Sequence, residues 1–550
     1  MSLDRRSFLK GSALAGGAVA LGALTGCSPS GNNFSESGNL PKGTLIEDFR
    51  NSVVVIDPIT KFLEEKTYDI VVVGAGTAGV PAVCAALEEG VSVACLQKES
   101  IVIAHGGGSS GIILDECNAM GILQYKYAWA EAIEFRHNPD LLQAFIEQSG
   151  ECAFWMVKNG HAVGLPPTST RQRREFDAGN ICVALSNNFG PKPINNQNIM
   201  TLLAEKAEKD GAHFYYKTPA VQLVTASNGA VTGVIGETDK GYIKFNANKG
   251  VIIAAGDYQN NRSLEERYCP DTLRFQKKQV NKTGDGILMS MLVGAVMTPV
   301  HHSKTMHDMD AAGSPMTAFP FMALDSKGER FMNENIPMHC WDMPLRRRKD
   351  TAADPGRFWR IFDSEYQSKY NTTIPVTTLE NYIPGLIANP PGVYPDLRDV
   401  HRANTLDELA RALGIPADGL KKSVDKWNSY CASGKDEQFG VLKDKMKPID
   451  KPPYWGIRQW IRLTAINSGI EINKDYQVVD KDGKVIKGLY AAGSVGGDVC
   501  GGLEWNMYQG GFTCGAYMTM GRYAAIHAVK GNMTPSKPVK FDEIKGYLPS

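Results

Sequence analysis

The chain lacks an excess of charge of either sign, and it lacks the cysteine patterns of metal-binding and haem-carrying domains. Lysine and arginine together number 59, and aspartate and glutamate together also number 59. No bulk field therefore attracts nucleic acid or an acidic surface. The cysteines are scattered, with no C-x-x-C pair and no C-x-x-C-H sequence. We expect no nucleic-acid partner, no bound metal, no zinc ribbon and no attached c-type haem.

The apolar stretch near the start of the chain is too short for a good membrane span. Gly11–Gly26 is rich in glycine and alanine and follows Arg5–Arg6. This order predicts a signal for twin-arginine export. Leu24–Cys27 looks like a lipoprotein cleavage site, at which Cys27 would carry lipid. We expect residues 1–27 to be a signal peptide and the mature protein to be lipid-anchored to the outer face of the bacterial cytoplasmic membrane.

A chain of 550 residues is too long to fold around one ordinary hydrophobic core, so we expect two folded domains that follow an N-terminal tail. Residues 28–66 begin with a Ser/Gly/Asn-rich run and are predicted to be a tether. Residues 67–300 and 455–550 are predicted to form one discontinuous domain. Residues 301–454 are rich in proline, methionine and aromatic residues and are predicted to form an inserted second domain, with a helical stretch at 405–431. The fold class predicted is α/β.

The first domain opens with a strand, a glycine-rich turn and a helix. The apolar run Ile70–Val73 precedes the sequence GAGTAG, helical spacing continues to Leu87, and a second buried strand follows at 91–96. Glycines in such a turn allow close approach of a pyrophosphate, which then faces the helix N-terminus. The sequence therefore predicts a Rossmann-like dinucleotide site, whose residues are Gly74, Gly76, Thr77, Ala78 and Gly79.

The end of the second strand departs from the usual dinucleotide pattern. An acidic residue is expected there to bind the adenosine ribose, but the chain has Leu96-Gln97-Lys98. A glutamine can still hydrogen-bond a hydroxyl group. Gln97 and Lys98 are therefore predicted to contact the cofactor.

Several further motifs occur in the order typical of one flavoprotein family. Along the chain they are the phosphate loop, the strand ending AAG at 254–256, TGDGI at 283–287, GERFMNE at 328–334, DEQFG at 436–440 and GLYAAG at 488–493. With them the chain resembles the fumarate reductase and 3-ketosteroid dehydrogenase family of FAD flavoproteins from Tyr68 to Val529. The resemblance implies a Rossmann-like FAD-binding domain with an inserted α+β capping domain. It also implies a flavin that exchanges hydride with a small organic molecule in a pocket between the two domains.

The resemblance implies which further residues would hold FAD. They belong to the loop at 105–111 beside the flavin ring, the strand end at 254–256, the TGDGI motif at the flavin's hydroxyls, and the turn and helix that cover its pyrimidine end. The residues are Gly107, Gly108, Ser109, Ser110, Gly111, Ala255, Gly256, Asp285, Gly493, Gly510 and Gly511. His105 raises covalent attachment as an alternative. A histidine in a glycine-rich loop is more often a solvated side chain, so non-covalent FAD is expected.

Three cationic positions of fumarate reductases are replaced in this chain. By the resemblance, the arginine that protonates the double bond falls at Met338, a second arginine falls at Glu504, and the substrate histidine falls at about Thr464 or Ala465. Bidentate arginines hold carboxylates, whereas a glutamate repels them. We therefore expect an aromatic, enone or steroid-like substrate in place of a dicarboxylate. The predicted substrate contacts are Met338, Trp341 and Trp505.

Four side chains are candidates for the proton donor. Tyr508 is the first choice because ketosteroid-type relatives use tyrosines in this segment, and the others are His339, Glu504 and Cys500.

The leading prediction is a reductase that passes hydride from flavin N5 to an activated C=C bond. Because NADH is unavailable outside the cytoplasm, an unidentified membrane electron-transfer partner would supply electrons in anaerobic respiration. One alternative is a ketone or ketosteroid-type dehydrogenase, and another is a non-catalytic flavin-binding lipoprotein. The sequence does not fix the direction of hydride transfer.

Overall fold

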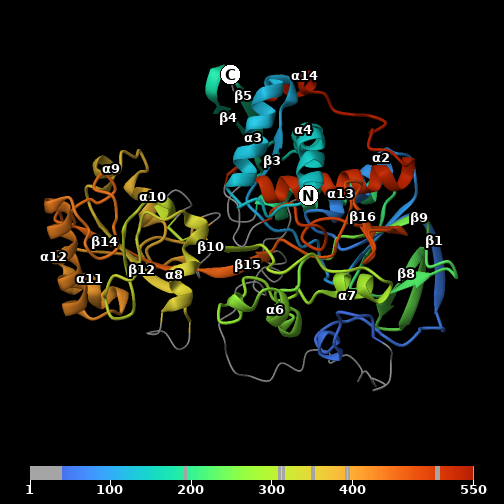
Figure 1. Ribbon diagram of the computed structural model, residues 1–550, viewed down its shortest axis with the longest axis horizontal. Coiled ribbons are helices and arrows are strands. Elements are labelled where there is room, and N and C mark those ends of the chain that lie inside the picture. Colours follow the sequence, from blue (N-terminus) through green and yellow to red (C-terminus); the bar gives the residue numbers. More distant parts are fainter. Residues whose placement is uncertain are drawn as a thin grey trace. The chain divides into compact units, whose positions relative to one another are not determined.

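The computed structural model describes residues 40–190, 195–307, 311–312, 316–348, 354–390, 393, 397–501 and 508–548. The chain divides into two compact units (Figure 1). Unit 1 comprises Met1–Pro270, Gln279–Lys304 and Ala465–Ser550, and unit 2 comprises Asp271–Lys278 and Thr305–Thr464.

Unit 2 is larger than the inserted domain predicted at 301–454, because two flanking segments join it. The backbone N–H of Lys278 donates to the Leu463 carbonyl at 2.8 Å, and the Leu463 N–H donates to the Gln276 carbonyl at 2.9 Å. These hydrogen bonds hold residues from both flanking segments together, and no local sequence pattern reveals them.

Unit 1 is built on an eight-stranded sheet whose central strands are parallel. The strand order is β16-β17-β9-β1-β2-β6, with β8 antiparallel to β9 and β7 antiparallel to β8. Residues 70–73 of β1 are buried, as expected for a parallel strand that is covered on both faces. The bounds are β1 (Glu64–Val73), β2 (Val93–Gln97), β6 (His213–Tyr216), β7 (Ala220–Thr225), β8 (Val231–Thr238), β9 (Gly241–Ile253), β16 (Gln477–Val479) and β17 (Val485–Ala491). The predicted Rossmann-like α/β architecture is confirmed.

Helices and a small second sheet complete unit 1. The sheet has the order β3-β5-β4, with β3 (Ser109–Ile112), β4 (Thr168–Glu175) and β5 (Ile181–Asn188). The helices are α2 (Gly79–Glu88), α3 (Ala119–Glu131), α4 (Pro139–Ala162), α5 (Asn195–Lys209), α6 (Arg262–Tyr268), α7 (Asp285–Leu292), α13 (Phe512–Lys530) and α14 (Phe541–Ile544). Helix α13 packs against α2 and α4 (Figure 1). Helix α13 approaches the start of α2 so closely that a Cβ on Gly521 would lie 1.9 Å from the Ala78 carbonyl oxygen.

Part of the segment predicted to be a tether is folded onto unit 1. The buried carboxylate of Asp48, in the 3₁₀ helix η2 (Ile46–Phe49), accepts two hydrogen bonds from Arg267 at 2.8 and 2.7 Å. Phe49 is also fully buried, and β1 already begins at Glu64. The boundary predicted at Lys66 is therefore too late, because a contact across 219 residues fixes the segment.

Unit 2 contains a four-stranded antiparallel sheet covered by helices. Its order is β11-β12-β14-β13, with β11 (Met322–Leu324), β12 (Arg357–Asp363), β13 (Val400–Ala403) and β14 (Tyr454–Trp460). The helices are α8 (Asp342–Arg347), α9 (Tyr366–Lys369), α10 (Val376–Glu380), α11 (Leu406–Leu413) and α12 (Ala417–Ser433), and β10 (Lys304–His307) pairs with β15 (Arg462–Ile466). The helix predicted at 405–431 is thus two helices, since Gly414 adopts a φ of 71° and Pro416 follows it.

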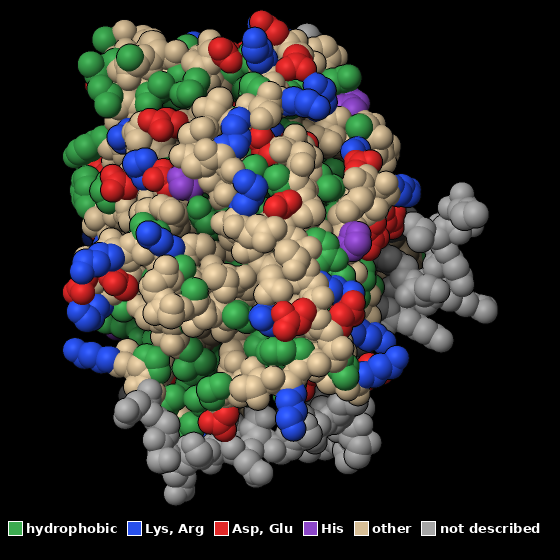
Figure 2. All heavy atoms as spheres, turned by 90° about the vertical axis from the view of Figure 1, so that its right-hand side faces the viewer, with side chains coloured by type: hydrophobic (Ala, Val, Ile, Leu, Met, Phe, Trp, Pro, Cys, Tyr) green, Lys and Arg blue, Asp and Glu red, His purple; other side chains and the backbone are tan. Residues whose placement is uncertain are grey.

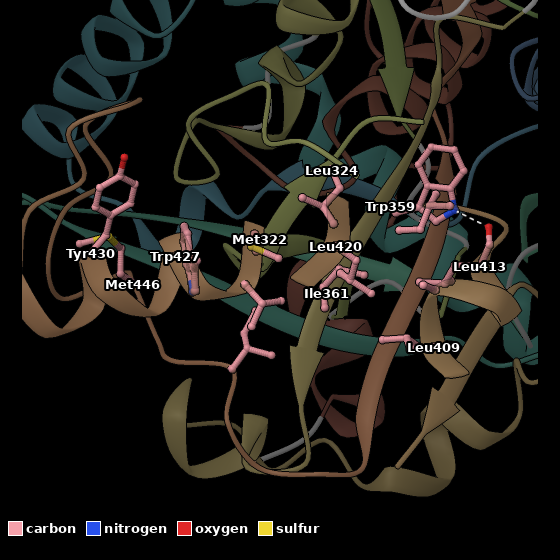
Figure 3. Packing of buried hydrophobic residues seen from close by; sticks show 14 of the residues in the cluster. Met322, Leu324, Trp359, Ile361, Leu409, Leu413, Leu420, Trp427, Tyr430 and Met446 are labelled. Atoms are coloured by element: carbon pink, nitrogen blue, oxygen red, sulfur yellow. Dashed lines mark hydrogen bonds between the residues drawn. The ribbon is translucent and has the colours of Figure 1, made fainter. Parts of the chain in front are cut away.

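One hydrophobic core cluster of unit 2 lies between its sheet and helices α11 and α12 (Figure 3). Trp359 and Ile361 from β12 meet Leu409 and Trp427 from the helices there. The Trp359 indole N–H donates to the Leu413 carbonyl at 3.0 Å, so its polar atom is satisfied inside the core.

Two of the sequence motifs meet inside unit 2 as a buried ion network. The Arg330 guanidinium donates to Glu334 at 2.9 and 2.6 Å and to Asp436 at 3.1 and 2.9 Å, and it lies 4.6 Å from the Trp427 ring centroid. Burial alone would raise the pKa of Asp436, but the hydrogen bonds from Arg330 lower it to about 2. The GERFMNE and DEQFG motifs therefore hold unit 2 together.

Among the residues that the structure describes, no helix is both long enough and apolar enough to span a membrane. On the face drawn in Figure 2, basic side chains are interspersed with acidic ones.

Candidate active site

The turns after four parallel strands meet at one edge of the main sheet. Val73, the last residue of β1, is paired with Leu96 of β2 and with Ile253 of β9. The Gly74 N–H donates to the Leu96 carbonyl at 2.8 Å, and the Ala492 N–H, just after β17, donates to the Ile253 carbonyl at 2.9 Å. The glycine-rich segments that are far apart in sequence thus lie at the carboxyl edge, where this type of sheet binds ligands.

The predicted phosphate loop is formed by backbone packed against backbone. Gly74 has a φ of 104°, and a Cβ on it would lie 2.6 Å from the Ala254 carbonyl oxygen. A Cβ on Gly79 would lie 1.8 Å from the Gly74 carbonyl oxygen. Helix α2 begins at Gly79, with Ala78 as its N-cap, so the positive end of its dipole lies at this loop, where an anion is favoured. The Thr77 hydroxyl donates to the His105 carbonyl at 3.1 Å and joins the two loops.

Lys98 and Asp285 form an ion pair at 2.9 Å beside this edge. The other oxygen of Asp285 accepts hydrogen bonds from the Ser52 and Thr283 hydroxyls, each at 2.9 Å. The Gln97 side chain is buried and donates to the Ile101 carbonyl at 2.9 Å. Contacts of all three predicted residues with FAD stay predictions, because protein groups already engage these side chains.

Lys282 is a basic residue at this edge that the sequence did not single out. Gly256 has a φ of 83°, and a Cβ on it would lie 2.3 Å from the Lys282 Nζ. Burial lowers the pKa of Lys282, and the neighbouring Asp257 raises it. The sequence signal that could have identified Lys282 is its position directly before the TGDGI motif.

The loop at 105–111 and the N-terminus of α13 are in direct contact. Gly511, the N-cap of α13, has a φ of 78°, and a Cβ on it would lie 2.9 Å from the Ser109 carbonyl carbon. The Ser109 hydroxyl is buried and has no partner among the described residues. The same holds for the side-chain oxygen of Asn196, whose nitrogen donates to the His105 carbonyl at 3.0 Å. Two orphaned buried polar atoms beside a helix N-terminus fit a polar ring such as the flavin's pyrimidine end.

The other residues predicted to hold FAD lie in the same region of unit 1. A Cβ on Gly108 would lie 2.7 Å from the Asn188 side-chain oxygen, and one on Gly111 would lie 2.0 Å from the Ser149 carbonyl oxygen. A Cβ on Gly493 would lie 3.1 Å from the Ala78 Cβ. The Gly510 carbonyl accepts a hydrogen bond from Gln172 at 3.3 Å. Gly107 precedes Gly108, Ser110 lies on β3 with Gly111, and Ala255 lies beside Gly256 in the turn after β9.

Tyr508 is held between a guanidinium and a buried hydrogen-bond network. The guanidinium carbon of Arg174, on β4, lies 3.9 Å from the centroid of the Tyr508 ring. The next residue, Gln509, donates to the Ser110 hydroxyl at 2.7 Å and accepts from the Tyr125 hydroxyl. Burial raises the pKa of Tyr508, and Arg174 acts in the opposite direction. The arrangement places a phenol against a permanently charged group.

The remaining catalytic candidates have different surroundings. Cys500 is buried in unit 1, 3.8 Å from the Thr513 hydroxyl, and burial raises its pKa to about 12, so it is a neutral thiol at pH 7. His339 lies in unit 2 on the 3₁₀ helix η7 (Met338–Cys340), where burial lowers its pKa. Glu504 lies outside the described residues.

The predicted substrate contacts are only partly described. The Trp341 indole N–H donates to the Ile336 carbonyl at 3.2 Å, and the Arg360 guanidinium lies 4.5 Å from its ring. Trp341 is buried within unit 2, so its contact with substrate stays a prediction. Trp505, Cys27 and the side chain of Met338 lie outside what the structure describes. No group of three or more His, Cys, Asp or Glu side chains suited to a metal ion occurs among the described residues.

The FAD binding domain family model matches residues 69–513. The chain belongs to this family of flavoproteins. A second model, for the twin-arginine translocation pathway signal, matches residues 2–22. The flavoprotein is therefore an FAD-dependent oxidoreductase that carries a signal for twin-arginine export, as its sequence predicted.

Two curated relatives and one solved structure illustrate the family. Urocanate reductase of Eggerthella lenta is 27% identical over 457 residues, which cover 79% of this chain and 70% of the relative. Vinyl phenol reductase of Lactiplantibacillus plantarum is 24% identical over 506 residues, which cover 84% of this chain and 97% of the relative. The open conformation of a flavocytochrome c3 fumarate reductase matches with a TM-score of 0.65 and 23% identity, covering 84% of this chain and 78% of that one, and shows the shared fold. These relatives give no support to a non-catalytic flavoprotein.

Proposed function

We propose that the flavoprotein reduces an activated C=C bond of an aromatic, enone or steroid-like molecule, with Tyr508 as the proton donor. When bound, FAD supplies hydride from its N5 atom. The phosphate loop at 74–79, the loop at 105–111 and the N-terminus of α13 would hold it. The observation that carries the proposal is the Arg174 guanidinium stacked 3.9 Å from the Tyr508 ring.

The surroundings of Tyr508 suit a general acid. Because burial raises its pKa, the phenol stays protonated at neutral pH and is available to donate to the α-carbon of the substrate. The phenolate left behind is then stabilised by the adjacent guanidinium. The hydrogen bonds of Gln509 to Ser110 and Tyr125 fix the backbone next to the phenol, so that the acid is held in place.

The substrate class is supported by the resemblance and by the relatives. By the resemblance, two arginines of fumarate reductases fall at Met338 and Glu504 in this chain. Without those arginines, a dicarboxylate loses its bidentate partners. Two of the curated relatives are named for urocanate and vinyl phenol, neither of which is a dicarboxylate.

The reverse reaction, dehydrogenation of a ketone or ketosteroid, is the second candidate function. The same phenol would act as a phenolate base in that direction, since both directions pass through one transition state. Burial raises the pKa of Tyr508 and so keeps the phenol in the protonated form, which is the form that donates a proton in reduction.

The proposal includes the surroundings in which the enzyme works. Lipid on Cys27 would keep the exported protein at the outer face of the cytoplasmic membrane, and an electron-transfer partner in that membrane would reduce the non-covalently bound flavin. The support is the LTGC sequence directly after the export signal.

A substrate panel tests the proposal. FAD-loaded mature protein is reduced anaerobically, and reoxidation of the flavin absorbance is followed with fumarate, urocanate, hydroxycinnamates, vinylphenols and enone steroids. Rapid reoxidation by one of the last four classes, but not by fumarate, is the expected result. Tyr508→Phe should slow that reoxidation about 100- to 10,000-fold. Tyr490→Phe, which removes a hydroxyl bonded to His527 at 3.1 Å, is the matched control. Reoxidation by fumarate alone would contradict the proposal.

A further inference from the structure

Two cysteines that are 65 residues apart in sequence lie side by side in unit 1. The Sγ atoms of Cys117 and Cys182 are 3.7 Å apart. The backbone around them fixes this approach: the Asn118 N–H donates to the Ile181 carbonyl at 3.2 Å, and the Ile113 N–H donates to the Val183 carbonyl at 2.8 Å. Cys182 lies within β5, and Cys117 directly follows the 3₁₀ helix η3 (Leu114–Glu116). The two segments are thus tied together on both sides of the thiols.

We propose that Cys117 and Cys182 are a redox-active pair that closes to a disulfide when the exported protein meets a disulfide oxidant. The pair is already in sulfur contact, and the backbone hydrogen bonds that flank it need not break. The export signal places the mature chain outside the cytoplasm, where disulfides form and persist.

The two thiols have different roles in this reaction. Cys117 is partly exposed, whereas Cys182 is 2% exposed. The Val183 N–H donates to the Cys117 Sγ at 3.2 Å, which stabilises a thiolate there. The hydrogen bond with Cys182 is the main cause that lowers the pKa of Cys117 to about 7, and the same hydrogen bond raises the pKa of Cys182. Cys117 is therefore the attacking sulfur and Cys182 the resolving one.

The reaction balances with the oxidant named. The Cys117 thiolate attacks one sulfur of an external disulfide, so that a mixed disulfide forms and one external thiolate leaves. Cys182 then loses its proton to the solvent and attacks the Cys117 sulfur, which releases the second external thiolate. The two protein thiols are oxidised by two electrons, and the external disulfide is reduced to two thiols.

The other cysteines that serve for comparison lack these features. Burial raises the pKa of Cys84 to about 12 and that of Cys431 to about 11. Cys431 is partly exposed in unit 2, which makes it a suitable control for accessibility. The pair also adjoins the Tyr508 site, because Cys182 is the cross-strand partner of Arg174.

Thiol mapping of the FAD-loaded mature protein tests the proposal. After incubation with oxidised glutathione, digestion without reductant should yield a peptide that links Cys117 to Cys182, and the count of titratable thiols should fall by two. Cys431→Ser should behave in the same way apart from its own missing thiol. The closed form should unfold at a temperature a few degrees higher, since the bond closes a long loop.

Single substitutions distinguish the two roles. Cys182→Ser, which keeps a hydroxyl donor beside Cys117, should trap glutathione on Cys117 as a stable mixed disulfide, whereas Cys117→Ser should leave Cys182 unmodified. Both variants retain a small side chain and should bind FAD as the wild type does, which flavin absorbance checks. The proposal is overturned if the wild type keeps both thiols free after oxidation, or if Cys182 reacts as readily in Cys117→Ser as Cys117 does in Cys182→Ser.

Discussion

Replacing Arg174 by methionine should slow substrate-dependent reoxidation of the flavin. Methionine keeps an apolar stem against the Tyr508 ring but removes the charge that lies 3.9 Å from the ring centroid. Two unit charges about 4 Å apart interact by about 4 kcal/mol at an effective dielectric constant of 20 and by about 1 kcal/mol in water. Both side chains are partly exposed, so an intermediate value of about 2 kcal/mol applies, which corresponds to a rate about 30-fold lower.

The assay is a single turnover of reduced flavin with the best acceptor from the substrate panel. Arg173→Met is the matched control, because Arg173 precedes Arg174 on β4 but forms an exposed pair with Glu175 at 2.8 Å. The loss in Arg174→Met should lie in the rate at saturating acceptor. Equal rates for the two methionine variants would refute the role of Arg174. A loss confined to the acceptor concentration needed for half-saturation would show that Arg174 binds an anionic group of the acceptor instead.

Three further outcomes are expected. Gly74→Ala, at a φ of 104° and with its Cβ 2.6 Å from a backbone oxygen, should weaken FAD binding about 10- to 100-fold by flavin titration, whereas Gly90→Ala, at positive φ in open space, should not. Asp436, with its pKa lowered to about 2, stabilises the fold above about pH 4 and loses that contribution as the pH falls toward 2. The Asp436→Asn variant should therefore have a free energy of unfolding, measured with urea, about 2 kcal/mol below that of the wild type at pH 6 but little below it near pH 2. An equal decrease at both pH values would contradict the lowered pKa of Asp436. Replacing both Arg5 and Arg6 by lysine should prevent export, so that cell fractionation finds the protein in the cytoplasm. Unchanged export would show that the protein uses another export route.

Local patterns were sufficient to predict the dinucleotide-binding part of the fold. The apolar run before Gly74 and the glycines after it fixed the first strand, turn and helix, because each of these elements depends on near neighbours. The last central strand, predicted at 488–493, is observed at Val485–Ala491. The helical stretch at 405–431 was predicted as one helix, although Gly414 and Pro416 were visible as a break.

The features that sequence reasoning missed depend on distant partners. The tether was predicted from the Ser/Gly/Asn-rich run at its start, whereas the segment near Asp48 is held by distant contacts such as the ion pair with Arg267. Cys117 and Cys182 form no recognisable sequence motif, because they are 65 residues apart and only the fold of η3 and β5 brings them together. Arg174 lies in a strand with three arginines, which predicts a solvated face, and only the pairing of β4 with β5 decides which of them lies on the Tyr508 ring.

The position of Arg174 bears on which acceptors the enzyme can use. An arginine that forms bidentate hydrogen bonds to a substrate carboxylate is committed to that anion, and the resemblance places such arginines where this chain has Met338 and Glu504. Arg174 instead lies against the face of a tyrosine, so its charge acts on the phenolate that proton donation creates. A cation that stabilises the Tyr508 phenolate lowers the activation barrier for any acceptor whose α-carbon reaches the phenol, whether or not that acceptor carries a carboxylate. Neutral aromatic and enone acceptors should therefore share the dependence on Arg174.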